Sequence, residues 1–201
     1  MGDAMKKIPT LFKRIFDEDG HIETITDEIT PGCEEAFKKG VATVKWDGAC
    51  CAIINGELYK RYDAKKGKKP PAGAIPCQEA PDPITTHWPH WVKVEPEKPE
   101  NKWFMQAWLD STFQGAIPLP DGTYEAMGKH FQGNPYGSPI DWLTMHGIDE
   151  ISVPRTYEGV KRFLQENEIE GIVFWLNGAP VCKIKRTDFG LPWPIRSDVH
   201  Q

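Results

Sequence analysis

Two Asn-Gly pairs, each placed near short apolar runs, are the feature that most constrains how this chain can fold. One pair lies within residues 51–59, and the other lies in the turn 176–180, between runs at 170–175 and 181–185. Asn-Gly is favoured in the two-residue turns of antiparallel hairpins, because both turn positions need a positive φ that these residues tolerate. Both segments are therefore predicted to be β-hairpins.

The rest of the chain predicts more strands and one amphipathic helix. Thr156 is suited to cap a helix over 156–167, in which Val160, Phe163 and Leu164 have the spacing of one helix face. Short apolar or β-branched runs predict strands at 41–44, 91–94, 103–109 and 122–127, and the Pro-, Lys- and Trp-rich stretch 64–101 otherwise predicts a loop. The sequence thus predicts an α+β fold of mainly antiparallel sheets flanked by helices.

Length and composition predict one domain spanning residues 1–201. A chain of 201 residues with 39% hydrophobic content can bury one sizeable core. No apolar stretch approaches the roughly 20 residues that cross a bilayer, so no membrane association is expected. The five cysteines are odd in number and contain no C-x-x-C pair, which suggests neither a disulfide framework nor a zinc site and favours a reducing, cytoplasmic compartment.

The net charge of −5 argues against a protein that holds nucleic acid by bulk electrostatics. A local contact remains open, because the stretch 60–69 carries six basic residues against one acid. This stretch is either a phosphate-tracking loop or a solvated loop kept flexible by like charges. His87 and His90 allow a metal pair, but a packed Trp/Pro loop is favoured there, and we assign these histidines no chemistry.

The positions that can carry chemistry begin with a lysine at the end of a predicted strand. Lys45 follows the run 41–44 and opens the segment Lys45-Trp46-Asp47-Gly48. Taken alone, it is an exposed strand-end lysine beside an Asp-Gly turn, a pattern that arises easily by chance. The other charged residues of the sequence therefore decide how Lys45 is interpreted.

The last predicted hairpin carries a carboxylate and two ammonium groups. Glu170 opens its first arm, and Lys183 and Lys185 alternate along its second arm. If both arms are extended, Glu170 shares a face with Ile172 and Phe174, and the two lysines share a face of the partner arm. The charged groups can then converge on one cleft, although a surface hairpin with a Glu/Lys pair has the same pattern.

Together these groups are suited to attack on a nucleoside triphosphate. A lysine amine is nucleophilic only when neutral, and an isolated lysine has a pKa of about 10.4, so the neighbours of such a lysine must favour its uncharged form. Lys183 and Lys185 would have this effect beside Lys45 and can also bind the triphosphate. Glu170 and Glu125 offer hard oxygen ligands for Mg²⁺.

In this order, the segments resemble the nucleotide-binding motifs of the covalent lysine nucleotidyltransferases, the superfamily of ATP-dependent ligases and mRNA-capping guanylyltransferases. The resemblance implies a nucleotidyltransferase domain of the ATP-grasp-like, ligase adenylylation kind, in which Lys45 becomes adenylylated. It also implies that Arg61 contacts the ribose or the acceptor phosphate and that Glu125 lies near the ribose and the metal. The residues that match its motifs are Lys45, Trp46, Asp47, Gly48, Arg61, Glu125, Glu170, Lys183 and Lys185.

Longer phrases resemble the small ATP-dependent 5′-to-3′ RNA ligase family. They lie at residues 75–79, 87–89, 131–136 and 185–190. This resemblance implies that AMP passes from ATP to Lys45 and then to an RNA 5′-phosphate, and that an RNA 3′-hydroxyl displaces it, with Mg²⁺ or Mn²⁺ as the metal. The superfamily resemblance also implies an aromatic side chain that stacks on the base, for which Trp142 and Phe131 both qualify, although core packing is favoured for either one taken singly.

Other functions stay open on the sequence. Sixteen residues follow Lys185, so no C-terminal OB domain is expected. This favours a minimal RNA ligase over a capping-type guanylyltransferase or a DNA ligase. The protein is expected to be a monomer. A nucleotidyltransferase acting on a protein or small molecule is a further alternative. The last is a non-catalytic nucleotide- or RNA-binding module, although the presence of Lys45, Glu170, Lys183 and Lys185 speaks against it.

Overall fold

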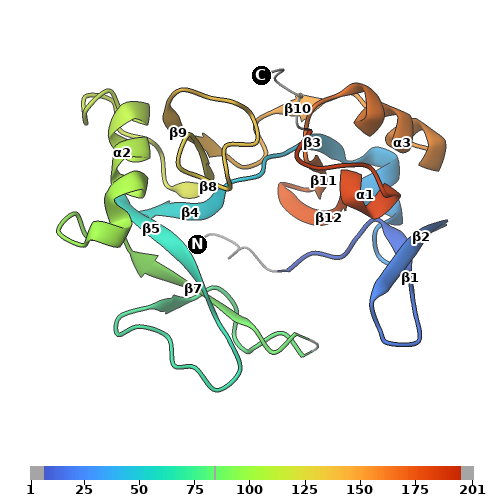
Figure 1. Ribbon diagram of the computed structural model, residues 1–201, viewed down its shortest axis with the longest axis horizontal. Coiled ribbons are helices and arrows are strands. Elements are labelled where there is room, and N and C mark those ends of the chain that lie inside the picture. Colours follow the sequence, from blue (N-terminus) through green and yellow to red (C-terminus); the bar gives the residue numbers. More distant parts are fainter. Residues whose placement is uncertain (1–6, 84, 196–201) are drawn as a thin grey trace, which may run out of the picture. The chain divides into compact units, whose positions relative to one another are not determined.

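The computed structural model describes residues 7–83 and 85–195, which fold as two compact units (Figure 1). The Glu125 unit comprises residues 47–146 together with Lys7, and the Lys45 unit comprises residues 8–46 and 147–195. The chain passes from the Lys45 unit to the Glu125 unit after Trp46 and returns after His146. That the two units make up one domain over 1–201 stays a prediction.

The Glu125 unit is built on a six-stranded sheet in which every neighbouring pair is antiparallel. The strand order is β6-β7-β5-β4-β8-β9. The strands are β4 (Ala49–Ile54), β5 (Glu57–Ala64), β6 (Ile75–Pro76), β7 (Trp88–Lys93), β8 (Gly122–Gly128) and β9 (Asp141–Met145). A short 3-10 turn, η1 (Pro99–Asn101), leads into α2 (Lys102–Ser111), which lies beside this sheet in Figure 1.

One face of this sheet is covered and the other carries polar side chains. Cys51, Ile53 and Tyr124 are buried in a cluster against which Phe104 and Trp108 of α2 pack. Because side chains alternate along a strand, the residues between them point to the opposite face. That opposite face carries the charged and sulfur-containing residues described below, beside a smaller buried cluster of Ala52, Cys77 and Trp91.

The first predicted hairpin is confirmed as β4 and β5. Asn55 and Gly56 form its turn with φ values of 52° and 74°. Both of their backbone N–H groups donate to the Asp121 carboxylate, at 2.6 and 2.9 Å. The turn thus has the positive φ angles that the Asn-Gly pair predicts, and Asp121 satisfies its donors.

The strand predicted at 103–109 is wrong, because these residues belong to the helix α2. Phe104, Ala107 and Trp108 have the spacing of one helix face and pack on the sheet, so helical periodicity prevailed over an apolar run that also suits a strand. The stretch 64–101 also contains more strand than predicted. β5 extends to Ala64, and β7 begins at Trp88 and ends at Lys93, so it covers all but the last residue of the strand predicted at 91–94.

The Lys45 unit combines a four-stranded sheet, a separate hairpin and two helices (Figure 1). The sheet order is β10-β3-β11-β12, again with antiparallel neighbours. Its elements are β1 (Phe12–Phe16), β2 (Ile22–Ile29), α1 (Glu34–Lys39), β3 (Val41–Lys45), β10 (Glu150–Ile151), α3 (Tyr157–Glu166), β11 (Gly171–Leu176), β12 (Ala179–Lys185) and the 3-10 turn η2 (Arg186–Phe189). β1 and β2 pair with each other as a two-stranded sheet.

The helix predicted at 156–167 is confirmed as α3. The Thr156 hydroxyl accepts a hydrogen bond from the backbone N–H of Gly159 at 3.0 Å, as an N-cap does. Val160 and Leu164 are fully buried in the core of this unit. The predicted helix therefore forms where its apolar face finds a core to cover.

The last hairpin is also confirmed, as β11 and β12, and Lys183 and Lys185 share a face opposite to Ile184 as predicted, but the predicted face of Glu170 is wrong. Ile172 lies opposite Ile184 in register, and both are fully buried in the core together with Phe174. Glu170 lies before the first residue of β11, and its carboxylate pairs with Lys45 rather than joining the core face. Alternation cannot be extended from a strand to the residue that precedes it, because that backbone is not held to the strand geometry.

Mainly antiparallel sheets with few helices confirm the predicted α+β class, and this arrangement is compatible with a nucleotidyltransferase-like domain. In residues 7–83 and 85–195, no helix is both long enough and apolar enough to cross a bilayer.

Candidate functional site

Lys45 forms an ion pair with Glu170 at the end of β3. The Lys45 ammonium donates to the Glu170 carboxylate, and the two side chains are only 24% and 12% exposed. Lys45 and Lys185 both lie opposite Gly171 in register, one on each neighbouring strand. The structure therefore brings together the lysine and the glutamate whose convergence the sequence predicts.

Gly171, which lies between Lys45 of β3 and Lys185 of β12, cannot be replaced by a larger residue. A Cβ atom on Gly171 would lie 2.3 Å from the backbone oxygen of Ile184, a distance that real Cβ atoms do not show. Since the obstacle is backbone, it cannot turn aside as a side chain can. The glycine keeps β11 and β12 close, and it places no side chain between Lys45 and Lys185 on the neighbouring strands.

Lys183 lies on the same face of β12 as Lys185 and opposite Val173 of β11. Burial, together with the charges of Lys45 and Lys185, lowers the pKa of the Lys183 ammonium to about 8. Glu170 acts in the opposite direction but does not offset these causes. This face thus holds more positive charge than its own carboxylate balances, which favours a polyanionic ligand such as a triphosphate.

Arg14 is a member of this cluster that the sequence does not reveal. It lies on β1, and its guanidinium donates to the Asp188 carboxylate at 2.9 Å. Asp188 also accepts from the backbone N–H of Lys185 at 2.8 Å, and the charge of Arg14 helps to lower the pKa of Lys183. An arginine in a short strand carries no local signal for this role, because only the packing of β1 decides where it lies.

The residues after Lys45 are held by side chains from elsewhere in the chain. The Trp46 indole N–H donates to the Asp149 carboxylate at 2.7 Å, within the Lys45 unit. The backbone N–H of Asp47 donates to the Tyr136 hydroxyl at 2.8 Å, within the Glu125 unit. The motif thus spans the point where the chain leaves one unit and enters the other.

Gly48 and Glu125 lie together in the Glu125 unit. The Gly48 N–H donates to Oε1 of Glu125 at 3.1 Å. A Cβ atom on Gly48 would lie 2.2 Å from the backbone oxygen of Ala126, so only glycine fits against β8 at this point. Gly48 therefore lets this segment approach β8, the strand that carries Glu125.

Glu125 is surrounded by groups that sequence analysis did not connect with it. It lies opposite Cys50 in register, and its Oε2 is 2.8 Å from Nε2 of His146. Arg61 follows Lys60, the register partner of Cys51, and so lies on the same face as Cys50. Arg61 also donates to Asp63 at 2.9 Å. Burial raises the pKa of the Cys50 thiol, and the Glu125 carboxylate raises it further.

The structure distinguishes the two candidates for base stacking. Phe131 is buried and makes an edge contact with Phe104 of α2, at 5.2 Å between ring centroids, so it belongs to the core. Trp142 lies opposite Met127, two residues along β8 from Glu125, and is only partly buried. Since residues two apart on a strand share a face, Trp142 lies on the face that carries Glu125.

The basic stretch 60–69 divides into two parts. Lys60 donates to the buried side chain of Asn101 at 2.6 Å, a structural contact. The exposed members all follow β5, and they are Lys65, Lys66, Lys68 and Lys69. His87 is exposed, whereas His90 is buried with Nδ1 2.8 Å from the Trp88 carbonyl oxygen, so packing accounts for His90.

Comparison with known proteins finds similarity to proteins named RNA ligase 1 from several animals. Rat RNA ligase 1 is 27% identical over 229 aligned positions, which cover 77% of this chain and 69% of the relative. Zebrafish RNA ligase 1 is 25% identical over 272 aligned positions, which cover 97% of this chain and 84% of the relative. Mouse RNA ligase 1 is 27% identical over 225 aligned positions, which cover 77% and 68%. No family model matches the chain.

The predicted site residues thus fall into two groups. Lys45, Glu170, Lys183 and Lys185 lie in the Lys45 unit, and Gly48, Arg61 and Glu125 lie in the Glu125 unit. Glu170 and Glu125 offer carboxylate oxygens, the donors that Mg²⁺ prefers. Their roles toward a nucleotide or a metal stay predictions.

Proposed function

We propose that this chain is an ATP-dependent RNA ligase that joins RNA 5′-phosphate and 3′-hydroxyl ends through a lysyl-AMP intermediate. The observation that carries the proposal is the ion pair of Lys45 with Glu170, on the sheet face that also holds Lys183 and Lys185. The similarity to RNA ligase 1 of rat, mouse and zebrafish supports an RNA ligase.

In the first step, Nζ of Lys45 attacks the α-phosphorus of ATP. A P–N bond forms, the bond to pyrophosphate breaks, and Nζ loses a proton. Lys183 and Lys185 bind the triphosphate and stabilise the negative charge that develops on the phosphate oxygens. The clustered positive charge of this face, which together with burial lowers the pKa of Lys183, supports this assignment.

In the later steps, an RNA 5′-phosphate oxygen displaces Lys45 from the AMP phosphorus and leaves an adenylylated RNA end. The RNA 3′-hydroxyl then attacks the 5′-phosphate, a phosphodiester bond forms, and AMP leaves. We assign Trp46, Asp47 and Gly48 to the nucleotide-binding motif, Arg61 and Glu125 to contacts with the nucleotide, and the exposed lysines after β5 to the RNA phosphates.

Glu170 and Glu125 are the residues that would hold Mg²⁺, or Mn²⁺ in its place, since each offers hard carboxylate oxygens. A divalent ion bound to such groups neutralises phosphate charge and polarises the phosphorus for attack. The side chain of Glu170 is 12% exposed and already contacts a cation in the form of the Lys45 ammonium, which fits this assignment.

The proposal is tested by intact-protein mass spectrometry after incubation with Mg²⁺ and each nucleoside triphosphate in turn. We expect a mass gain of one AMP with ATP alone, its loss in Lys45→Ala, and its retention in the control Lys13→Ala, whose side chain is 47% exposed. A second assay uses 5′-phosphorylated RNA and looks for an adenylylated end and a joined product.

The other open functions give different results in these two assays, when DNA ends are tested beside RNA ends. A gain of one GMP from GTP would indicate a capping-type guanylyltransferase. Joining of DNA but not RNA ends would indicate a DNA ligase. An AMP adduct that is never passed to a nucleic acid would indicate a protein or small-molecule nucleotidyltransferase. Nucleotide binding without any adduct, in a folded protein that is not already adenylylated, would indicate a binding module and overturn the proposal.

A further inference from the structure

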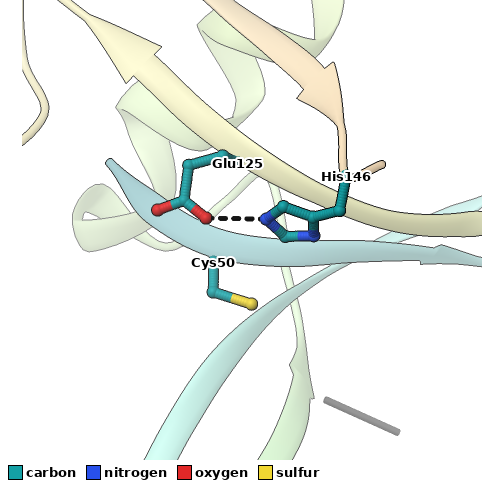
Figure 2. A group of neighbouring side chains, drawn as sticks. All are labelled: Cys50, Glu125 and His146. Carbon is teal, nitrogen blue, oxygen red and sulfur yellow. Dashed lines mark hydrogen bonds and ion pairs between the residues drawn. The ribbon is translucent and has the colours of Figure 1, made fainter. Parts of the chain in front are cut away.

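We propose that Cys50, Glu125 and His146 form a binding site for a thiophilic divalent cation of the Zn²⁺ class. Figure 2 shows Glu125 and His146 facing each other, with the Cys50 side chain beside them. One ligand atom from each residue lies within 4.8 Å of the other two. The site goes beyond the proposed ligase activity and does not depend on it.

The strand pairing holds these three residues together. Cys50 of β4 lies opposite Glu125 of β8, and Glu125 lies opposite Thr144 of β9, two residues before His146. The backbone N–H of His146 donates to the Thr123 carbonyl at 3.0 Å, which continues the pairing past the end of β9. The ligands therefore come from two neighbouring strands and from the residue that follows a third strand of the same sheet, which is a rigid support for a metal site.

The spacing suits a tetrahedral ion after small side-chain rotations. Zinc bonds to sulfur, nitrogen and oxygen are about 2.0–2.3 Å long, so ligand atoms of a tetrahedral site lie about 3.3–3.8 Å apart. The three ligand atoms now lie within 4.8 Å of one another, and Nε2 of His146 is 2.8 Å from Oε2 of Glu125. An ion would replace the proton that these two groups share, and Cys50 would turn toward it.

The donor set decides the class of ion. Thiolate and imidazole ligands select zinc and its neighbours among the transition metals, whereas Mg²⁺ prefers oxygen ligands alone. Three protein ligands also leave a fourth position for water or an exogenous ligand, as in catalytic zinc sites. A site with Cys50 is therefore chemically distinct from the assignment of Glu125 to Mg²⁺.

Two details of the surroundings favour an ion here. Nδ1 of His146 is buried and has no hydrogen-bond partner in the part of the chain that the structure describes, so the ring is only half satisfied. On the other side, Oε1 of Glu125 accepts from the Gly48 N–H at 3.1 Å. Such outer contacts orient metal ligands, and Gly48 would hold Glu125 in this way.

The test is a titration of the full chain with Co²⁺ under a non-chelating phosphine reductant, followed by competition with Zn²⁺. Cobalt bound to a thiolate gives a sulfur-to-metal charge-transfer absorption that carboxylate and imidazole ligands do not give. We expect one equivalent of Co²⁺ with this band, displacement by Zn²⁺, and no displacement by excess Mg²⁺. Circular dichroism checks that each protein is folded.

The variants assign the ligands. Cys50→Ser should remove the band and weaken Zn²⁺ binding by at least about tenfold, and His146→Gln should weaken it at least as much, since even outer contacts of metal ligands contribute about ten- to a hundredfold. Cys182→Ala, which removes a thiol of the Lys45 unit, is the control and should leave both unchanged. If Cys50→Ser does not fold, His146→Gln and Glu125→Gln decide by the same titration.

The proposal is overturned if the folded wild-type chain gives no charge-transfer band. It is also overturned if the band persists in Cys50→Ser, or if Cys182→Ala removes it. These readouts measure metal binding alone, so they stand even if no AMP adduct is ever found. Should both proposals hold, an ion on Glu125 would also compete with the nucleotide, a consequence that rests on the proposed function.

Discussion

The sheet that carries Lys45 and the sheet that carries Glu125 are built alike but present different chemistry. In each sheet, one face is buried in an apolar core and the alternate residues of the same strands carry polar groups on the other face. The Lys45 sheet presents mainly ammonium groups around Glu170, and the Glu125 sheet presents a thiol, an imidazole and a carboxylate. The first set suits phosphates, and the second suits a soft cation.

This difference shows that the fold supplies positions while the side chains supply the chemistry. Both sheets use a glycine to bring backbones together, Gly171 in one and Gly48 in the other. Next to each glycine the structure holds a glutamate, and the partner of that glutamate differs: an ammonium for Glu170 and an imidazole for Glu125. A glutamate at a similar place therefore has a different partner in each sheet.

The largest effect is expected from Lys45→Arg. A guanidinium keeps the charge but stays protonated, so it cannot attack phosphorus, and adduct formation should fall by at least about a thousandfold. The measurement is intact mass after incubation with Mg²⁺ and ATP, with Lys13→Arg as the control. An adduct that survives in Lys45→Arg would move the nucleophile to another lysine, and peptide mapping would then examine Lys183, whose pKa is about 8.

Substitutions of the two aromatic candidates should affect different properties, stability for Phe131 and ATP binding for Trp142. Phe131→Ala removes a buried ring from the core and should lower the free energy of unfolding by about 3–5 kcal/mol. Trp142→Ala should change stability much less but weaken ATP binding by about tenfold, as loss of one stacked base contact does. Urea unfolding and nucleotide titration measure the two effects. Unchanged ATP affinity in Trp142→Ala would remove it as the stacking residue.

Glu170→Ala should slow metal-dependent adenylylation by about ten- to a hundredfold. It removes a proposed oxygen ligand and the partner of the Lys45 ammonium. The rate of adduct formation is measured across a range of Mg²⁺ concentrations, with Glu166→Ala, an exposed glutamate of α3, as the control. If the variant needs no more Mg²⁺ than the wild type, Glu170 is not a metal ligand.

Lys183→Met should raise stability at pH 7 by about 1–3 kcal/mol, because it removes a buried ammonium whose charged form is disfavoured. The pKa of Lys183 is about 8 in the folded chain and 10.5 when unperturbed. Between these values the unfolded state binds more protons, so the wild type gains stability as pH rises through this window. The advantage of Lys183→Met should therefore shrink from pH 8 to pH 10.

Urea unfolding of both proteins at several pH values measures this difference directly. Lys13→Met, on the exposed surface of β1, is the control and should show no such trend. An advantage of Lys183→Met that is constant with pH would mean that packing rather than charge separates the two proteins.

The smallest effect is expected from the exposed lysines after β5. Replacing Lys65, Lys66, Lys68 and Lys69 by alanine should flatten the salt dependence of RNA binding by up to about 3 units of slope and leave adenylylation unchanged. Binding is measured at several salt concentrations, with replacement of the exposed α1 residues Lys38 and Lys39 as the control. An equal loss of binding and adenylylation would place the loop at the nucleotide instead.

The local elements were predicted well where a few neighbouring residues decide the structure. The Asn-Gly hairpins and the Thr156 cap formed as predicted, because turn and cap geometry depend on residues within one turn of each other. The 103–109 run was predicted wrongly because its apolar residues suit a strand and a helix equally. Only the sheet that it packs against decides between the two.

The sequence by itself determined the order of the charged motifs and the hairpin on which Lys183 and Lys185 share a face, because alternation along a strand is written in adjacent residues. Only the tertiary structure decided that Arg14 joins this face and that Cys50, Glu125 and His146 meet. The cysteine spacing had suggested no zinc site. Residues far apart in the chain come together through strand pairing and core packing, and neither leaves a local signal in the sequence.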